Sequence, residues 1–118
     1  MAFLYMLECA GGAYYTGIAK DIERRLREHV DGSVKGAKYT RSHPPLKVVA
    51  LWEVGDYRLA AKGEYALKQL SRECKEALIE EPEQLTEHCP NLAGLGFSPC
   101  FPLPELKKKE KEKERADR

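Results

Sequence analysis

The sequence predicts an α+β domain in which helices pack against a small, mainly antiparallel sheet of three strands, in the order β-β-α-β-α-α. Two apolar runs rich in β-forming residues, 3–7 and 13–18, flank a Gly-Gly pair, and a third such run covers 46–54. Segments with helical spacing of apolar residues follow the second and third runs. With 118 residues, the chain can form one core without needing disulfides or a structural metal.

The first two runs predict a β-hairpin, because the Gly11-Gly12 pair between them allows a tight reversal. Tyr5 and Tyr15 are then expected on neighbouring strands. Since alternate residues of a strand share a face, Gly17 should point to the same side as Tyr15 and leave open space beside its ring.

The next segment predicts a helix that begins after Asp21, a good N-cap residue. Arg25 and His29 fall beside its apolar stripe, and Asp31-Gly32-Ser33 ends it. Two titratable groups at a buried edge indicate either a cleft, or a closed core with a salt-bridged Arg and a hydrogen-bonded His. The stripe consists of Ile22, Leu26 and Val30, and the residues expected to face solvent are Arg24, Arg27 and Glu28.

A basic, irregular loop is expected over 34–43, where cationic residues alternate with a glycine and an aromatic ring. Lys35, Lys38 and Arg41 could hold phosphates, and Tyr39 could stack on a base. Ordinary solvated loop charge explains each of these residues equally well.

The third run is expected to be a central strand, followed by a long helix that Asp56 caps. Glu64 lies on the margin of the apolar face of this helix. Gly63 costs about 1 kcal/mol relative to Ala inside a helix, so its presence predicts close packing on the sheet. Ser71 is expected to cap a further helical segment.

Charge is distributed unevenly along the chain. Residues 1–75 carry 13 Lys and Arg against 9 Asp and Glu, whereas the only charged residues of 76–104 are glutamates. The first segment would therefore suit a polyanion, although less strongly than a dedicated nucleic-acid coat protein. Four widely spaced cysteines without a secretory leader indicate reduced thiols and a cytoplasmic protein, and no membrane span is expected.

Three regions are predicted: a domain over 1–80, an extension over 81–104 and a charged tail over 105–118 that is either disordered or a solvated helix. In the extension, Phe97, Phe101 and Leu103 either fold back on the core or dock a partner. A protein partner could also bind through the tail.

Several separated motifs occur in a characteristic order: Phe3-Leu4-Tyr5, Tyr15-Thr16-Gly17, Arg25 with His29, and Gly63-Glu64-Tyr65. Over about residues 3 to 80 this pattern resembles the GIY-YIG nuclease superfamily. It is closest to a small single-domain bacterial branch that reads Tyr-Thr-Gly-Ile-x-x-Asp-x-x-x-Arg, then Gly-Ala-Lys, then Glu-Tyr-x-x-Lys-x-Leu-Ser/Thr-Arg.

The resemblance implies a metal-dependent endonuclease that hydrolyses DNA phosphodiester bonds. Glu64 would hold one Mg²⁺ or Mn²⁺, and Arg25 would clamp phosphate oxygens. Tyr5 and Tyr15 match the paired tyrosines of the family, of which Tyr5 would help to deprotonate the attacking water while His29 positions or shares the proton. Arg25 and the metal would lower the pKa of Tyr5 for this task.

The sequence departs from the family pattern at Phe3, where glycine is usual, and at Thr16, where isoleucine is common. An asparagine that many members carry after the glutamate has no counterpart, and Lys38 or Lys68 is a candidate substitute that would contact nucleic acid.

No separate recognition domain is visible in the sequence. Structure-directed cleavage of branched, damaged or single-stranded DNA is therefore expected. The alternatives are a nucleic-acid-binding module with little activity and a protein-interaction domain.

Overall fold

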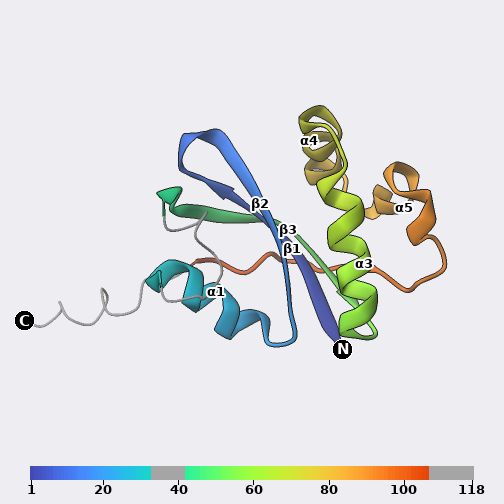
Figure 1. The fold of residues 1–118 in the computed structure, drawn as a ribbon, viewed down its shortest axis with the longest axis horizontal. Helices are drawn as coiled ribbons and strands as arrows, with labels where there is room; N and C mark the ends of the chain where they lie inside the picture. Colours follow the sequence, from blue (N-terminus) through green and yellow to red (C-terminus); the bar gives the residue numbers. More distant parts are fainter. Residues whose placement is uncertain (33–41, 107–118) are drawn as a thin grey trace, which may run out of the picture.

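The computed structural model describes residues 1–32 and 42–106, and it contains an antiparallel sheet with the strand order β2-β1-β3-β4 and helices on both faces (Figure 1). Short 3₁₀ turns cover Ala10–Gly12, Pro82–Gln84 and Pro90–Leu92. The strands are β1 (Ala2–Cys9), β2 (Ala13–Ala19), β3 (Pro45–Val54) and β4 (Ser98–Pro99), and the helices are α1 (Ile22–Asp31), α3 (Tyr57–Lys68), α4 (Arg72–Glu80) and α5 (Leu85–His88).

The predicted α+β class is confirmed, but the prediction of three strands is wrong. The chain returns from α5 along the outer edge of β3, where Ser98 pairs with Glu53 and Pro99 pairs with Trp52. This two-residue strand has no periodic pattern of its own. It forms because the preceding helices bring it to an open sheet edge, which a local sequence signal does not reveal.

The two faces of the sheet are covered by different helices. Successive residues of β1 alternate between the faces, so that Leu4 and Met6 pack under α3 and α4, whereas Tyr5 and Leu7 pack with Leu26 of α1. The central β1 is fully buried over this stretch. The edge strand β2 therefore has α1 on one face and α3 on the other (Figure 1).

The helix starts follow the capping rules. The side chains of Asp21, Asp56 and Ser71 each accept a hydrogen bond from a backbone N–H three residues on, at 3.1, 2.8 and 3.1 Å. Gly32, with φ 72°, ends α1 in the left-handed conformation that glycine adopts readily. These local signals set where α1, α3 and α4 begin, as the sequence predicted, whereas α5 has no side-chain cap.

The segment after residue 80 is part of the core. Leu85, Cys89 and Leu92 are buried on the α3 side of the sheet, and the indole Nε1 of Trp52 donates a 2.9 Å hydrogen bond to the carbonyl of Pro82. Phe97 packs against this same core.

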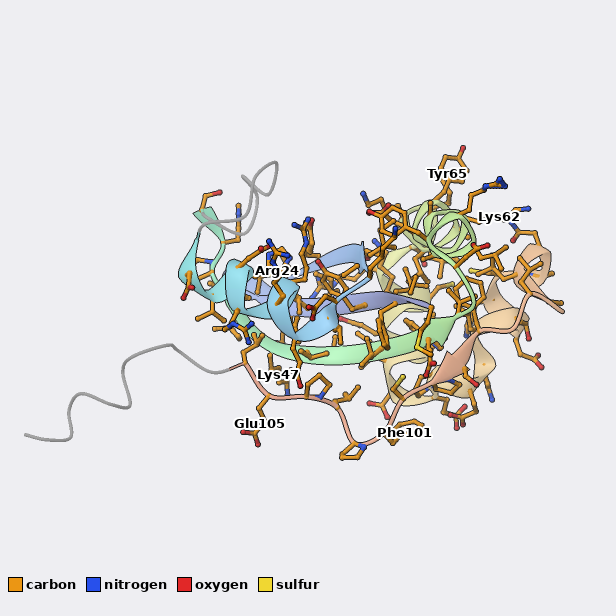
Figure 2. The ribbon with its side chains drawn as sticks, turned by 90° about the horizontal axis from the view of Figure 1, so that it is seen from below. Arg24, Lys47, Lys62, Tyr65, Phe101 and Glu105 are labelled. Carbon is orange, nitrogen blue, oxygen red and sulfur yellow. The ribbon has the colours of Figure 1, made fainter. Side chains whose placement is uncertain are left out.

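The end of the described chain lies on the α1 side of the sheet. Leu103 packs against the core there. Phe101 remains exposed on the side of the molecule opposite Tyr65 (Figure 2). The predicted charged tail lies, except for Glu105 and Leu106, outside the described residues. Within the described ranges, no helix is long and apolar enough to span a bilayer.

Gly63 lies where α3 packs tightly against its surroundings. A Cβ atom there would lie 2.8 Å from Cζ of Phe97 and 2.9 Å from Cδ2 of Leu4. Both distances are shorter than a normal carbon contact. The close packing predicted for this glycine is therefore confirmed. The contacting side chains are Leu4 of the sheet and Phe97.

We expect Gly63→Ala to destabilise the protein by about 1–2 kcal/mol, because overpacking a tight core outweighs the gain in helix propensity. Urea unfolding followed by circular dichroism measures the change. Gly55→Ala is the matched control, since no atom lies within 4 Å of its added Cβ, and it should change stability by less than about 0.5 kcal/mol. A Gly63→Ala variant as stable as the wild type would contradict this packing.

Candidate functional site

The candidate site lies on the α1 side of the β1–β2 hairpin, where Tyr5 stands directly opposite Gly17. A Cβ atom on Gly17 would lie 2.5 Å from the hydroxyl of Tyr5 and 2.6 Å from its Cζ, so the phenol ring lies over the glycine. The same Cβ would be 3.0 Å from Cε2 of Tyr15. The space expected beside Tyr15 is therefore occupied chiefly by Tyr5.

Three rings form a contiguous cluster. The hydroxyl of Tyr5 is hydrogen-bonded to Nε2 of His29 at 2.7 Å, and the His29 ring meets the Tyr15 ring edge-on at a centroid distance of 5.1 Å. Tyr5 and His29 are 0% and 1% exposed, whereas Tyr15 is half-buried. Tyr15 is therefore the member of the cluster that reaches the protein surface.

Arg25 lies beside this cluster and is not fully satisfied by the protein. Its Nη1 is 3.5 Å from Oε1 of Glu28, but its Nε is buried and has no hydrogen-bond partner within residues 1–32 and 42–106. An unpaired buried donor is unfavourable, and a charged one is best complemented by an anionic oxygen. The ion pair with Glu28 therefore accounts for one end of the guanidinium and leaves Nε without a partner in the described residues.

Glu28 differs from its prediction. It was expected to face solvent, but it is half-buried and bridges two arginines, with Oε2 3.1 Å from Nε of Arg24 and Oε1 near Arg25. Helical spacing alone placed it away from the apolar stripe. Its carboxylate is instead held by ion pairs with two arginines of α1, Arg24 and Arg25.

Burial controls the protonation of the cluster. Desolvation raises the pKa of Tyr5 above its ordinary value, against the opposing effect of Arg25. Desolvation, reinforced by the positive charge of Arg25, lowers the pKa of His29 to about 4. At neutral pH, Tyr5 is therefore protonated and His29 is neutral. Arg25 lowers the pKa of Tyr5, as expected, but without a metal its effect is smaller than that of burial, and the pKa of Tyr5 stays above its ordinary value.

Glu64 lies on α3, on the opposite face of the sheet from Arg25, and the edge strand β2 runs between their helices. Its charge contributes to the raised pKa of Tyr5, which places it within electrostatic range of the ring cluster. Nζ of Lys68 is 3.3 Å from Oε2 of Glu64, so this lysine, expected at the nucleic acid, is paired with the carboxylate.

The donors present fit a divalent ion of the Mg²⁺ type. No group of three or more His, Cys, Asp or Glu side chains that could enclose a metal occurs in the described part of the chain. Mg²⁺ is usually held by one or two carboxylates together with waters and substrate phosphates. A single half-buried carboxylate such as Glu64 meets that requirement only when a phosphate supplies further ligands.

Four of the expected nucleic-acid contacts, Lys35, Lys38, Tyr39 and Arg41, lie outside the described residues.

The structure reveals a hollow of about 340 Å³ where β2, α1 and α3 meet, lined by Arg25 and by two residues not singled out from the sequence, Lys20 and Tyr57. One signal could have identified Tyr57. It precedes Glu64 by seven residues, a spacing that returns to the same face of a helix.

Comparisons with known proteins agree with these features. A family model described as the GIY-YIG catalytic domain matches residues 1–77. The UPF0213 protein BH0048 of Halalkalibacterium halodurans is 44% identical over 77 residues, which are 65% of this chain and 80% of that protein. The UPF0213 protein FN1575 of Fusobacterium nucleatum is 34% identical over 99 residues, covering 84% of this chain and 97% of the relative.

A solution NMR structure of the UPF0213 protein BH0048 from Bacillus halodurans is also similar, with 41% identity and a TM-score of 0.45, covering 73% of this chain and 94% of that one. The matched residues of the family model include the β1–β2 hairpin, α1 and α3, which together carry Tyr5, Tyr15, Arg25, His29 and Glu64. The chain therefore belongs to the GIY-YIG domain family.

Proposed function

We propose that this protein is a metal-dependent endonuclease that hydrolyses DNA phosphodiester bonds and selects its substrate by structure rather than by sequence. The observation that carries the proposal is the partly exposed guanidinium of Arg25 beside the Tyr5–His29 pair, with a buried Nε that has no partner among the described residues and with Glu64 across the β2 edge. Membership of the GIY-YIG family supports a nucleic-acid substrate.

Arg25 would bind the phosphate that is cleaved. The partly exposed end of the guanidinium would donate to one non-bridging oxygen, while Glu28 holds Nη1 and limits the rotation of the group. A planar fork of donors matches phosphate geometry better than the single ammonium of a lysine. The same contact would stabilise the additional negative charge that develops in the transition state.

Glu64 would hold one Mg²⁺ or Mn²⁺ together with oxygens of the bound phosphate. Such an ion neutralises charge on the phosphate and lowers the pKa of water, which supplies the nucleophile. Lys68 is free to leave the carboxylate because its side chain is long and mostly exposed. In the complex, it would contact a neighbouring phosphate.

The two tyrosines would have different roles. Tyr15 reaches the surface and would orient the attacking water, whereas Tyr5 has no solvent contact and a raised pKa, which disfavours a phenolate at neutral pH. Tyr5 would instead act as a positioning residue. Its hydroxyl fixes the ring of His29, and its own ring is fixed by Gly17.

The first test is cleavage of duplex, single-stranded, flap and branched DNA in Mg²⁺ or Mn²⁺. Glu64→Gln and Arg25→Lys should each reduce the rate by roughly 100-fold or more, because each removes a group that stabilises the transition state. Glu23→Gln and Arg27→Lys are matched controls, since both residues are exposed on α1, and they should cleave like the wild type.

Equal activity of all five proteins would contradict the proposed site. Binding that weakens steeply with salt, without metal-dependent cleavage, would instead indicate a nucleic-acid-binding module. Absence of binding even at low salt would favour a protein-interaction domain.

The roles of the ring cluster predict a specific pattern of coupling. Tyr15→Phe should lower the single-turnover rate by about tenfold or more. Tyr5→Phe and His29→Gln should each lower it, and the double variant should be no slower than the slower single variant, because both changes remove the same hydrogen bond. Tyr14→Phe is the control, since Tyr14 lies on the other side of β2 and bonds Glu76. A double variant whose fold-loss in rate equals the product of the two single fold-losses would refute the positioning role of Tyr5.

The neutral state of His29 predicts a pH dependence of stability. The folded pKa of about 4 is below the ordinary value of 6.5, so the unfolded chain binds a proton that the folded protein excludes between these pH values. Stability should therefore fall as the pH falls through this range, by roughly 2 kcal/mol between pH 7 and pH 5 from this residue. Urea unfolding of wild type and His29→Gln measures the effect. The difference between their free energies of unfolding should be smaller at pH 5 than at pH 7. A difference that stays constant with pH would contradict the lowered pKa of His29.

A further inference from the structure

A hollow of about 340 Å³ lies where the end of β2 meets the first turns of α1 and α3. It is an open depression of the surface rather than an enclosed cavity. Arg25, the proposed phosphate clamp, lines one side, and Lys20 and Tyr57 line another. The hollow therefore adjoins the proposed cleavage site without coinciding with it.

Lys20 and Tyr57 form a cation–π pair in this hollow. Nζ of Lys20 lies 5.6 Å from the centroid of the Tyr57 ring, and the tyrosine remains 44% exposed. Such a contact limits the motion of a flexible ammonium. The result is a positioned cation next to an aromatic surface that is still partly open to a ligand.

The carboxylates around the hollow are already engaged, but the ammonium of Lys20 is not. Asp21 caps α1, and Glu28 pairs with two arginines. Lys20 forms no salt bridge with any acidic side chain that the structure describes. A ligand with an anionic oxygen would pair with this ammonium, and the partly exposed guanidinium of Arg25 adds positive charge on the other side of the hollow.

Helix geometry relates the hollow to the proposed metal ligand. Tyr57 and Glu64 are seven residues apart on α3, so they lie on nearly the same face at an axial separation of about 10 Å. A strand with one phosphate between Arg25 and Glu64 would continue along this face. The adjoining nucleotide would then lie over Tyr57.

We propose that this hollow binds the nucleotide next to the cleaved phosphate, with Lys20 holding a phosphate and Tyr57 stacking on the base. In a duplex both faces of each base are covered by neighbouring bases, so Tyr57 can stack only on an unpaired, unstacked base. The inference rests on the proposed nuclease function and narrows its substrate class to strands with an unpaired nucleotide beside the cleavage point.

Binding without cleavage tests this inference. Fluorescence anisotropy in EDTA compares a labelled single strand of about 12 nucleotides with a blunt duplex of the same sequence. Tyr57→Ala should bind the single strand about 5- to 150-fold more weakly, the range expected for loss of one stacked base, with little change for the duplex. Tyr57→Phe should bind like the wild type because the ring is retained.

Tyr65→Ala is the matched control. Tyr65 is 71% exposed on the same helix and projects away from the sheet with Lys62 (Figure 2). Its replacement should leave single-strand affinity within about twofold of the wild type. Equal losses of single-strand affinity in Tyr57→Ala and Tyr65→Ala would overturn the assignment. An equal loss of affinity for single strand and duplex in Tyr57→Ala would also overturn it.

The salt dependence of binding tests Lys20 separately. Lys20→Gln should reduce the slope of log affinity against log salt concentration by about 0.7, the value for one phosphate contact on a single strand. Lys62→Gln controls for the loss of a lysine charge and should change the slope less. An unchanged slope in Lys20→Gln would show that Lys20 does not contact a phosphate of the bound strand.

The two proposals can fail independently. If the single strand shows the Tyr57 effect but Mg²⁺ or Mn²⁺ supports no cleavage, the nucleotide site stands and the nuclease proposal fails. If the wild type cleaves while Tyr57→Ala keeps its affinity and its KM for single-stranded and flap DNA, the nuclease proposal stands and the nucleotide site fails. Absence of single-strand binding by the wild type would also overturn the site.

Discussion

The contact between the ring of Tyr5 and the bare backbone of Gly17 is the constraint on which the rest of the site depends. Any side chain at Gly17 would occupy the space that the Tyr5 hydroxyl fills. Because the Tyr5 ring lies over Gly17, its hydroxyl reaches His29 of α1 and comes beside Arg25. One cross-strand pair thereby fixes how the hairpin and α1 face each other.

The same burial that orders this cluster also determines its charge state. Removing Tyr5 and His29 from water favours the neutral form of both, so the strongest remaining charge beside them is Arg25. A buried guanidinium N–H without a partner among the described residues is costly. The rest of this guanidinium is partly exposed and can pair with an anion, which is the physical basis for proposing a phosphate at this position.

The edge position of β2 explains how helices on opposite faces of one sheet can contribute to a single site. A central strand would separate Arg25 from Glu64, but β2 has no neighbouring strand on its outer side among the residues that the structure describes. The first turns of α1 and α3 therefore meet beside its end, where the hollow with Lys20 and Tyr57 lies. Gly63 contributes by letting α3 approach the sheet closely just before Glu64.

By itself, the sequence determined the local parts of this molecule: the hairpin, the helix caps at Asp21, Asp56 and Ser71, and the α+β order up to residue 80. These follow from interactions between residues close along the chain, for which residue type and periodicity are sufficient. Family motifs also indicated the candidate side chains, because their order is preserved in the sequence.

Only the tertiary structure decided which groups meet across long separations. The pairing of β4 with β3, the contact of Phe97 with Gly63 and the hollow at Tyr57 each join segments that no periodic pattern relates. It also decided the protonation of Tyr5 and His29, because desolvation depends on everything packed around a group rather than on its neighbours in sequence.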